Sequence, residues 1–150
     1  MESSEIQAIV KKHGGRESAL LAVLQDIQAK EKYLPKEVLE EVAQKMNIPM
    51  TRIFRIATFY NALSIKPRGR HKIDVCLGTA CHVRGGSKIV DKLERDLGVR
   101  VGETTKDKRF TLESVRCVGC CSLGPVMVVD GNVYGRVTQE KVPSLVKEYK

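Results

Sequence analysis

The sequence predicts an α+β protein in which an N-terminal helical bundle, residues 1–66, precedes a βαβ-ββα domain, residues 71–150. Two observations support this prediction. Apolar residues recur at helical spacing through the first 63 residues, and beyond Pro67-Arg68-Gly69 they alternate as they do in strands. A chain of 150 residues is long enough for two small domains, and its 42% apolar content is typical of folded rather than disordered proteins.

The N-terminal half contains three or four expected helices. A short one covers residues 4–12, and a second follows Gly14-Gly15. Pro35 suits the first turn of a third helix, which Asn47 can cap, and Pro49 can open a fourth. The apolar stripes of the second, third and fourth helices are expected to be Leu20-Val23-Leu24-Ile27, Val38-Val42-Met46 and Ile53-Ile56-Phe59-Tyr60-Leu63.

The C-terminal half changes to strand periodicity. Residues 72–75 and 109–116 read as strands, and a helix that ends at Gly98 lies between them. A right-handed crossover makes these two strands parallel in one sheet. The strands at 126–129 and 133–137 flank Asp130-Gly131, a dipeptide that favours a tight hairpin turn. We expect a last helix from Thr138, although Pro143 fits its first turns poorly. This order of elements is thioredoxin-like.

Composition narrows the class of protein. No apolar run approaches the roughly 18 residues of a membrane-spanning helix, and the acidic start Met1–Glu5 is unlike a signal peptide. We therefore expect a cytoplasmic protein, in which clustered cysteines indicate metal binding or redox chemistry rather than disulfides. The net charge is +8, and the densest basic segment, residues 66–72, is expected to be a solvated linker.

The five cysteines form two groups, each at the end of an expected strand. Cys76 ends the first strand and Cys81 follows it, whereas Cys117 ends the second and precedes Cys120 and Cys121. Parallel strands place these loops at one end of the sheet, where four thiolates can converge. The wide spacing of the first pair favours an iron–sulfur cluster over zinc, whose sites usually contain two Cys-x-x-Cys knuckles, and over a dithiol redox site. Either Cys120 or Cys121 can complete the set.

Other chemistry has weaker signals. The histidines lack the paired Cys/His spacing of a Rieske site, so we expect all three at the surface. There is no dinucleotide fingerprint or phosphate-binding loop, and no substrate site is predicted. Residues 40–60 superficially resemble a helix-turn-helix with Arg52 and Arg55 on its second helix, which raises the alternative of an iron–sulfur transcriptional sensor. A zinc-stabilised scaffold is a third alternative.

The segments Cys76-Leu77-Gly78-Thr79-Ala80-Cys81 and Cys117-Val118-Gly119-Cys120-Cys121-Ser122 resemble the thioredoxin-like [2Fe–2S] ferredoxin family. Leu34–Leu39 and Ala57-Thr58-Phe59-Tyr60 are similar to its helical segment. The family includes the small iron–sulfur subunit of NADH:quinone oxidoreductase and the gamma-type subunits of NAD(P)-linked, often electron-bifurcating, [FeFe]-hydrogenases and formate dehydrogenases.

The resemblance implies a function and a ligand set. It implies one [2Fe–2S] cluster held by Cys76, Cys81, Cys117 and Cys121, with Cys120 as a small buried residue. It also implies an electron-transfer subunit of an NAD(P)H-dependent oxidoreductase, with no active site of its own. FMN and NAD(P) are then expected on a partner subunit, beside a catalytic hydrogenase or dehydrogenase subunit, and neither nucleic acid nor membrane insertion is expected. Gly-Cys-Cys-Ser favours the hydrogenase-type branch, with the respiratory and formate dehydrogenase subunits as alternatives.

Overall fold

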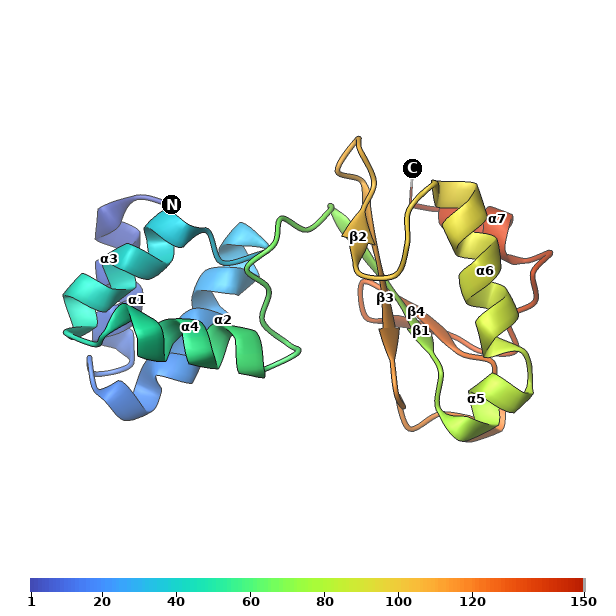
Figure 1. Cartoon of the computed structure of the whole chain (residues 1–150), viewed down its shortest axis with the longest axis horizontal. Helices are drawn as coiled ribbons and strands as arrows, with labels where there is room; N and C mark the ends of the chain where they lie inside the picture. The colour runs from blue at the N-terminus through green and yellow to red at the C-terminus, as the bar shows by residue number, and fades with distance from the viewer. Residues whose placement is uncertain (150) are drawn as a thin grey trace. The chain divides into compact units, whose positions relative to one another are not determined.

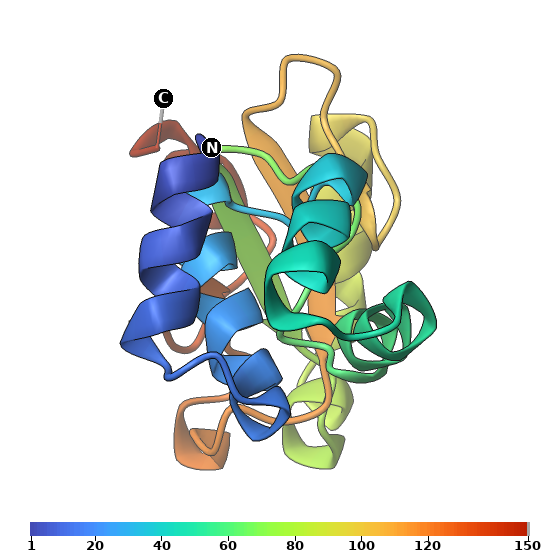
Figure 2. The ribbon, with the colours of Figure 1, turned by 90° about the vertical axis from the view of Figure 1, so that its left-hand side faces the viewer.

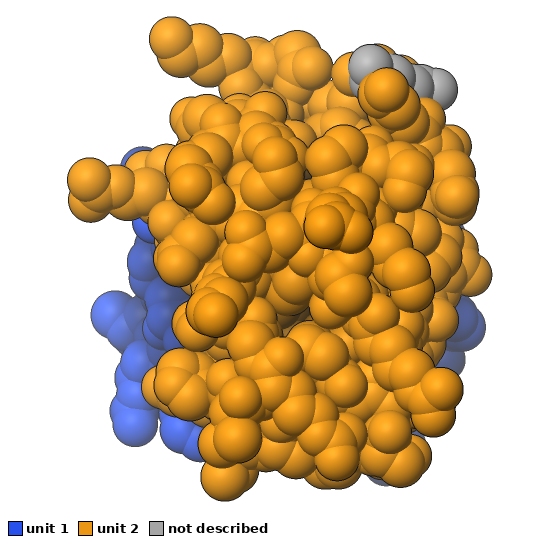
Figure 3. Space-filling view, turned by 90° about the vertical axis from the view of Figure 1, so that its right-hand side faces the viewer, with its two compact units in different colours: residues 1–67 blue, residues 68–150 orange. Residues whose placement is uncertain are grey.

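The computed structural model describes residues 1–149, which divide into two compact units. Unit 1 is Met1–Pro67, and unit 2 begins at Arg68 (Figure 3). Each unit has its own apolar core. No helix among these described residues is long and apolar enough to cross a membrane.

Unit 1 consists of four helices: α1 (Ser3–Lys12), α2 (Leu20–Glu31), α3 (Lys36–Met46) and α4 (Met50–Phe59). A 3-10 turn, Glu17–Ala19, precedes α2. Helix α1 packs against α2 and α3, and α4 packs against the same two helices (Figure 2). Pro35 and Pro49 immediately precede α3 and α4, and Asn47 ends α3 in the left-handed conformation, φ 53°. The sequence prediction of these helices is therefore confirmed.

The predicted apolar stripe of α4 is wrong at Phe59 and Tyr60, although its last member, Leu63, is buried beyond the helix. Ile53 and Ala57 form the buried face of the helix, whereas Phe59 is 77% exposed and Tyr60 is 40% exposed. At 3.6 residues per turn, Phe59 lies about 120° around the helix from Ile53, so the two side chains cannot share a face. Tyr60 lies beyond the helix, in extended backbone, and its ring contacts that of Phe59 edge-on.

Unit 2 is a five-stranded sheet in the order β2-β3-β1-β4-β5. Strands β1 (His71–Cys76) and β3 (Phe110–Val115) are parallel, which confirms the predicted crossover, and helix α6 (Gly86–Leu97) connects them. The strands β4 (Met127–Val129) and β5 (Asn132–Tyr134) form an antiparallel hairpin that extends the sheet from β1. Helices α6 and α7 (Val142–Lys147) pack together, and α6 lies against β1 and β3 (Figure 1).

The short strand β2 and the start of the last helix differ from the sequence prediction, and β5 ends at Tyr134 rather than at residue 137. A short strand, β2 (Glu103–Thr104), pairs antiparallel with β3, and two residues are too few to give a periodic signal. The last helix begins at Val142 rather than at Thr138. Pro143 therefore falls in the first turn, where a missing backbone N–H breaks no helical hydrogen bond.

The β4–β5 hairpin turns through Asp130 and Gly131, as the sequence predicts. Both residues have positive φ, 49° and 87°, which is the conformation of the tight turn that matches strand twist. A Cβ atom added at Gly131 would meet nothing within 4 Å, so a substitution there tests backbone conformation alone. We expect Gly131→Ala to lower the free energy of unfolding by about 1 kcal/mol in a denaturant titration.

Gly131→Asn is the matched comparison for this turn. Asparagine tolerates the left-handed conformation better than alanine, so we expect it to lose less than half as much stability. An alanine variant as stable as the natural protein would show that this turn does not hold the hairpin in place.

Candidate metal centre

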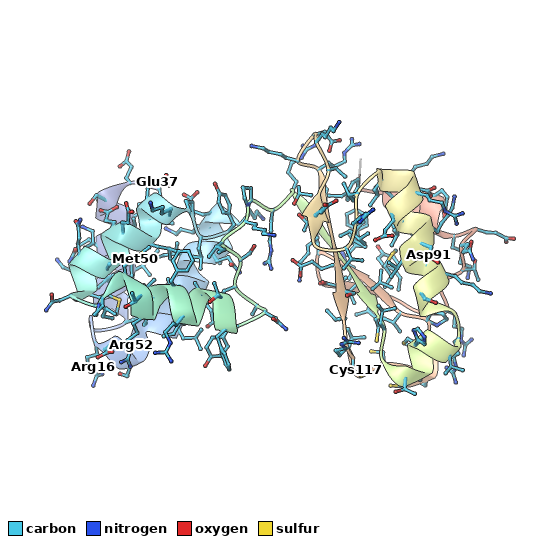
Figure 4. All side chains as sticks on the ribbon, viewed as in Figure 1. Arg16, Glu37, Met50, Arg52, Asp91 and Cys117 are labelled. Atoms are coloured by element: carbon cyan, nitrogen blue, oxygen red, sulfur yellow. The ribbon has the colours of Figure 1, made fainter. Side chains whose placement is uncertain are left out.

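The two cysteine groups lie at one end of the sheet of unit 2. Cys76 is the last residue of β1 and is paired in register with Val115, the last residue of β3, so Cys117 follows two residues beyond the same end. A helix absent from the sequence prediction, α5 (Thr79–Val83), carries Cys81, and a 3-10 helix, Cys121–Leu123, begins with Cys121. Figure 4 labels Cys117 at the end of the sheet near which Figure 1 shows α5.

Gly78 allows the two cysteine loops to meet. A Cβ atom at this position would collide with the backbone carbonyl oxygen of Arg116, the residue immediately before Cys117. The loop after β1 therefore packs directly on the backbone of the loop after β3. This contact positions the second cysteine group beside the first.

Four of the five thiols interact with one another. Cys81 and Cys117 each lower the pKa of Cys76, and Cys117 raises the pKa of Cys121, so these four thiols lie near one another. Cys76 and Cys81 are each 2% exposed, whereas Cys117 and Cys121 are exposed. Within residues 1–149, no three Cys, His, Asp or Glu side chains are placed to hold a single metal ion.

The local environment shifts the pKa values of these thiols in different directions. Burial opposes ionisation of Cys76, but backbone hydrogen bonds at Gly78 and Val118 and the neighbouring thiols lower the pKa of Cys76 overall. Burial raises the pKa of Cys81, and its hydrogen bond to Cys76 raises it further. The hydrogen bond with Cys117 raises the pKa of Cys121. Because metals bind thiolates, binding at this site must release protons, and its affinity depends on pH.

Cys120 has a different environment from the other four. Its side chain is half-buried and packs against the small apolar cluster of Cys76, Cys81 and Val126. Its Sγ atom lies 3.9 Å from the carbonyl oxygen of Val118, which accepts its hydrogen bond. This packing agrees with the interpretation of Cys120 as a small residue of the protein interior, although it is only partly buried.

The histidine prediction is correct for one residue of three. His82 is exposed, but His13 and His71 are half-buried and paired with carboxylates. His13 Nε2 lies 2.9 Å from Asp26 Oδ2, and His71 Nδ1 lies 2.6 Å from Asp130 Oδ2. The carboxylate partner is 13 residues away in sequence for His13 and 59 residues away for His71. The spacing of nearby residues does not predict such partners.

Arg84 is a residue of the site that the sequence does not predict. Arg84, just after α5, donates a hydrogen bond from Nη1 to the carbonyl oxygen of Cys121 at 2.9 Å. It ties the loop of Cys81 to the loop of Cys121. The sequence does not predict this role, because the carbonyl that Arg84 binds is 37 residues away and nothing in the local sequence distinguishes Arg84 from other exposed arginines.

The donor set fits a [2Fe–2S] cluster. Such clusters take four thiolates, and this end of the sheet brings four neighbouring thiols together from two loops. The backbone N–H of Gly119 points to Cys117 Sγ at 3.3 Å, and hydrogen bonds of this type to the ligand sulfurs tune such clusters. Cys76 and Cys81 belong to a small apolar cluster. It also contains buried Val126, and the half-buried side chains of Val115, Val118 and Val128 pack against it.

Comparisons with known proteins identify the family of this chain. The sequence profile of the family described as thioredoxin-like [2Fe-2S] ferredoxin matches residues 6–150. The HndA subunit of the NADP-reducing hydrogenase of Solidesulfovibrio fructosivorans is 36% identical over 145 residues, which cover 97% of this chain and 85% of that protein. The E 2 subunit of the NADH-quinone oxidoreductase of Rhizobium meliloti is 34% identical over 146 residues, covering 97% and 87%.

A solved structure shares the fold. The NAD+-reducing [NiFe]-hydrogenase in the air-oxidized state matches with a TM-score of 0.75 at 21% identity, over 87% of this chain but only 22% of the hydrogenase chain. The match therefore concerns a small part of a much longer protein. Since the family profile and the relatives above span nearly the whole sequence, this chain belongs to the thioredoxin-like [2Fe–2S] ferredoxin family, whose members carry one [2Fe–2S] cluster.

Proposed function

We propose that Cys76, Cys81, Cys117 and Cys121 hold the cluster of this chain. The observation that carries this proposal is the convergence of the two cysteine loops at one end of the sheet, where the loop after β1 packs on the backbone of the loop after β3 and these four thiols influence one another's pKa values. Cys120 bonds a backbone carbonyl and packs on the apolar cluster. It is the natural candidate for the fifth cysteine that does not bind iron.

The same site supports a role as an electron-transfer subunit. The cluster, when bound, supplies one-electron transfer, and the protein supplies ligation, burial and hydrogen bonding. Cys76 and Cys81 anchor the site in the interior, whereas exposed Cys117 and Cys121 bring the opposite side to the surface. Electrons therefore need to cross little protein between the ligand sulfurs and a docked partner.

The partner we propose is a subunit that binds flavin and NAD(P), beside a separate hydrogenase or dehydrogenase subunit. The relatives named above are subunits of a NADP-reducing hydrogenase and of NADH-quinone oxidoreductase. A flavin exchanges a pair of electrons with NAD(P)H and single electrons with a metal cluster, so it couples the two kinds of transfer. This chain then needs no substrate pocket of its own, and we propose that it works in the cytoplasm.

Among these assemblies we favour the hydrogenase type. The hydrogenase relative is 36% identical, and the pair Cys120-Cys121 favours that branch of the family. The respiratory alternative has its own support, since the NADH-quinone oxidoreductase relative is 34% identical over the same share of the chain. Identification of the subunits that co-purify with the natural protein decides between the two.

The test of the cluster is the spectrum of protein prepared without oxygen. We expect a brown protein with about two irons per chain, which on reduction with dithionite gives the electron paramagnetic resonance (EPR) signal of a one-electron [2Fe–2S] centre. Stoichiometric zinc without iron in such a sample would overturn the proposal. Co-purification of a flavin subunit would support the electron carrier, whereas retention by duplex DNA at moderate salt would favour a transcriptional sensor.

A further inference from the structure

The end of unit 2 that carries the cysteines is free of acidic residues in sequence. No Asp or Glu occurs in residues 75–90, in residues 114–129 or in residues 131–139, the three segments that contain or adjoin the cysteine loops. The same segments contain cationic side chains, of which Arg84, Lys88, Arg116 and Arg136 are all exposed. Because the whole chain has 18 acidic residues, this separation of charge is a distinct feature.

The arginines lie close to the exposed thiols. Arg84 donates its hydrogen bond to the carbonyl of Cys121, and Arg116 directly precedes Cys117. Arg136 is brought to the same place by the backbone, since its N–H donates to the carbonyl oxygen of Leu123 at 2.6 Å. Within residues 1–149, none of these three guanidinium groups forms an ion pair.

Three of the carboxylates that border these segments, Asp74, Glu113 and Asp130, are already paired. Asp74 lies 2.9 Å from the ammonium of Lys72, and Glu113 lies 3.0 Å from Lys72 and 3.2 Å from Arg68. Asp130 holds His71. These contacts also show that the basic segment 66–72, predicted as a solvated linker, is partly held against the sheet. These three carboxylates are therefore engaged elsewhere, and within residues 1–149 no ion pair neutralises Arg84, Arg116 or Arg136.

Apolar side chains complete this surface. Val83, at the end of α5, is 79% exposed, and Leu123, two residues after Cys121, is 42% exposed. An apolar centre beside unpaired cations is the composition of a protein docking surface, in which the charges orient the partner and the apolar groups are buried on contact.

We propose that this face, defined by Val83, Arg84, Arg116, Leu123 and Arg136, docks a carboxylate-rich surface of the flavoprotein partner. The inference rests on the proposed electron-transfer function and adds the charge and position of the contact. Unpaired arginines attract carboxylates and can bind them through two parallel hydrogen bonds. Docking here places the partner directly over exposed Cys117 and Cys121, where the path for an electron is shortest.

The simpler alternative is that these arginines only offset the charge of the cluster, which is about −2 when two ferric ions are bound by four thiolates and two sulfides. The two ideas predict different effects of charge reversal. Compensation alone predicts a change in reduction potential and no change in partner binding. A docking face predicts weaker binding of an acidic partner, with a strong dependence on salt.

The experiment uses the full holoprotein, with an acidic flavodoxin as the probe flavoprotein. The test variant is Arg116→Glu/Arg136→Glu, and Arg84 is left unchanged because it ties two loops together. The matched control is Lys106→Glu, an exposed lysine in the loop between β2 and β3, at the opposite end of the sheet from the cysteines. The measured quantities are the dissociation constant at low and high salt, the EPR signal, and the retention of duplex DNA.

We expect the double variant to bind flavodoxin about tenfold more weakly at low ionic strength, and the difference to vanish near ~0.5 M salt. The control is expected to bind within about twofold of the natural protein, since its charge lies more than a screening length from the face. Equal binding by the double variant and the control, or loss of DNA retention without loss of flavodoxin binding, would overturn the docking face.

Failure of the proposed function gives a different result. If the natural protein holds no [2Fe–2S] cluster, its EPR signal is absent, yet the arginines remain and their effect on binding is still measurable. If the cluster is present and charge reversal has no effect on binding, the electron carrier stands and the docking face is wrong.

Discussion

Replacing Cys121 by serine is expected to destroy the [2Fe–2S] cluster, whereas replacing Cys120 by serine is expected to leave it. Cys121 lies beside Cys117, which raises its pKa, whereas Cys120 donates a hydrogen bond to the carbonyl of Val118. A serine hydroxyl is a poor substitute for a thiolate ligand of iron. Purified Cys121→Ser should therefore lose most of its iron and visible absorbance, and Cys120→Ser should keep about two irons per chain.

The two variants are controls for each other, because the residues are adjacent and the substitution is the same. Cys120→Ser is expected to lower stability slightly, since its half-buried side chain packs against the cluster of Cys76, Cys81 and Val126. Far-ultraviolet circular dichroism of both proteins separates loss of iron from loss of fold. The reverse result, an iron-free Cys120→Ser and an intact Cys121→Ser, would exchange the two assignments.

Leu112→Ala is expected to lower the stability of unit 2 by about 2–5 kcal/mol, the usual cost of a cavity in a protein core. Leu112 is fully buried on β3, between β1 and β2 in the sheet, and its strand leads to Cys117. Loss of this side chain should therefore release the cluster at a lower temperature or denaturant concentration. The measurement is the midpoint of the loss of visible absorbance.

Leu24→Ala is the matched variant in unit 1. Leu24 is also fully buried, but it belongs to the core of the four helices, which shares no residue with the core around Leu112. We expect it to weaken the helical signal by circular dichroism at a similar cost and to leave the midpoint of cluster loss unchanged. Equal shifts of that midpoint in both variants would show that the two units unfold together.

Local sequence signals predicted most of the fold because they act over a few residues. Asn47 and Gly98 end helices in the left-handed conformation, and Asp130-Gly131 makes the predicted turn. The prediction failed where apolar residues are not buried. Phe59 and Tyr60 extend the apolar run of α4, yet they lie off its buried face and remain exposed. Composition alone does not distinguish a core side chain from one at the surface.

The candidate site was predictable to the extent that strand ends position ligands. Parallel β1 and β3 bring Cys76 and Cys117 to one end of the sheet, as the spacing of the cysteines indicates. The choice between Cys120 and Cys121 was not determined by that argument, because both follow the same strand. The rest of the site was not predictable from local spacing. Helix α5 carries Cys81, and Arg84 donates a hydrogen bond to the carbonyl of Cys121, 37 residues away in sequence.

The two edges of the sheet have a consequence for how this protein meets others. The edge strands are β2, of two residues, and β5, of three, so each offers few unpaired backbone groups to another chain. Strand addition and edge-to-edge aggregation both need a longer template. Assembly through backbone pairing is thus disfavoured by the short edges, and recognition is left to side chains, whose charge and shape can specify one partner.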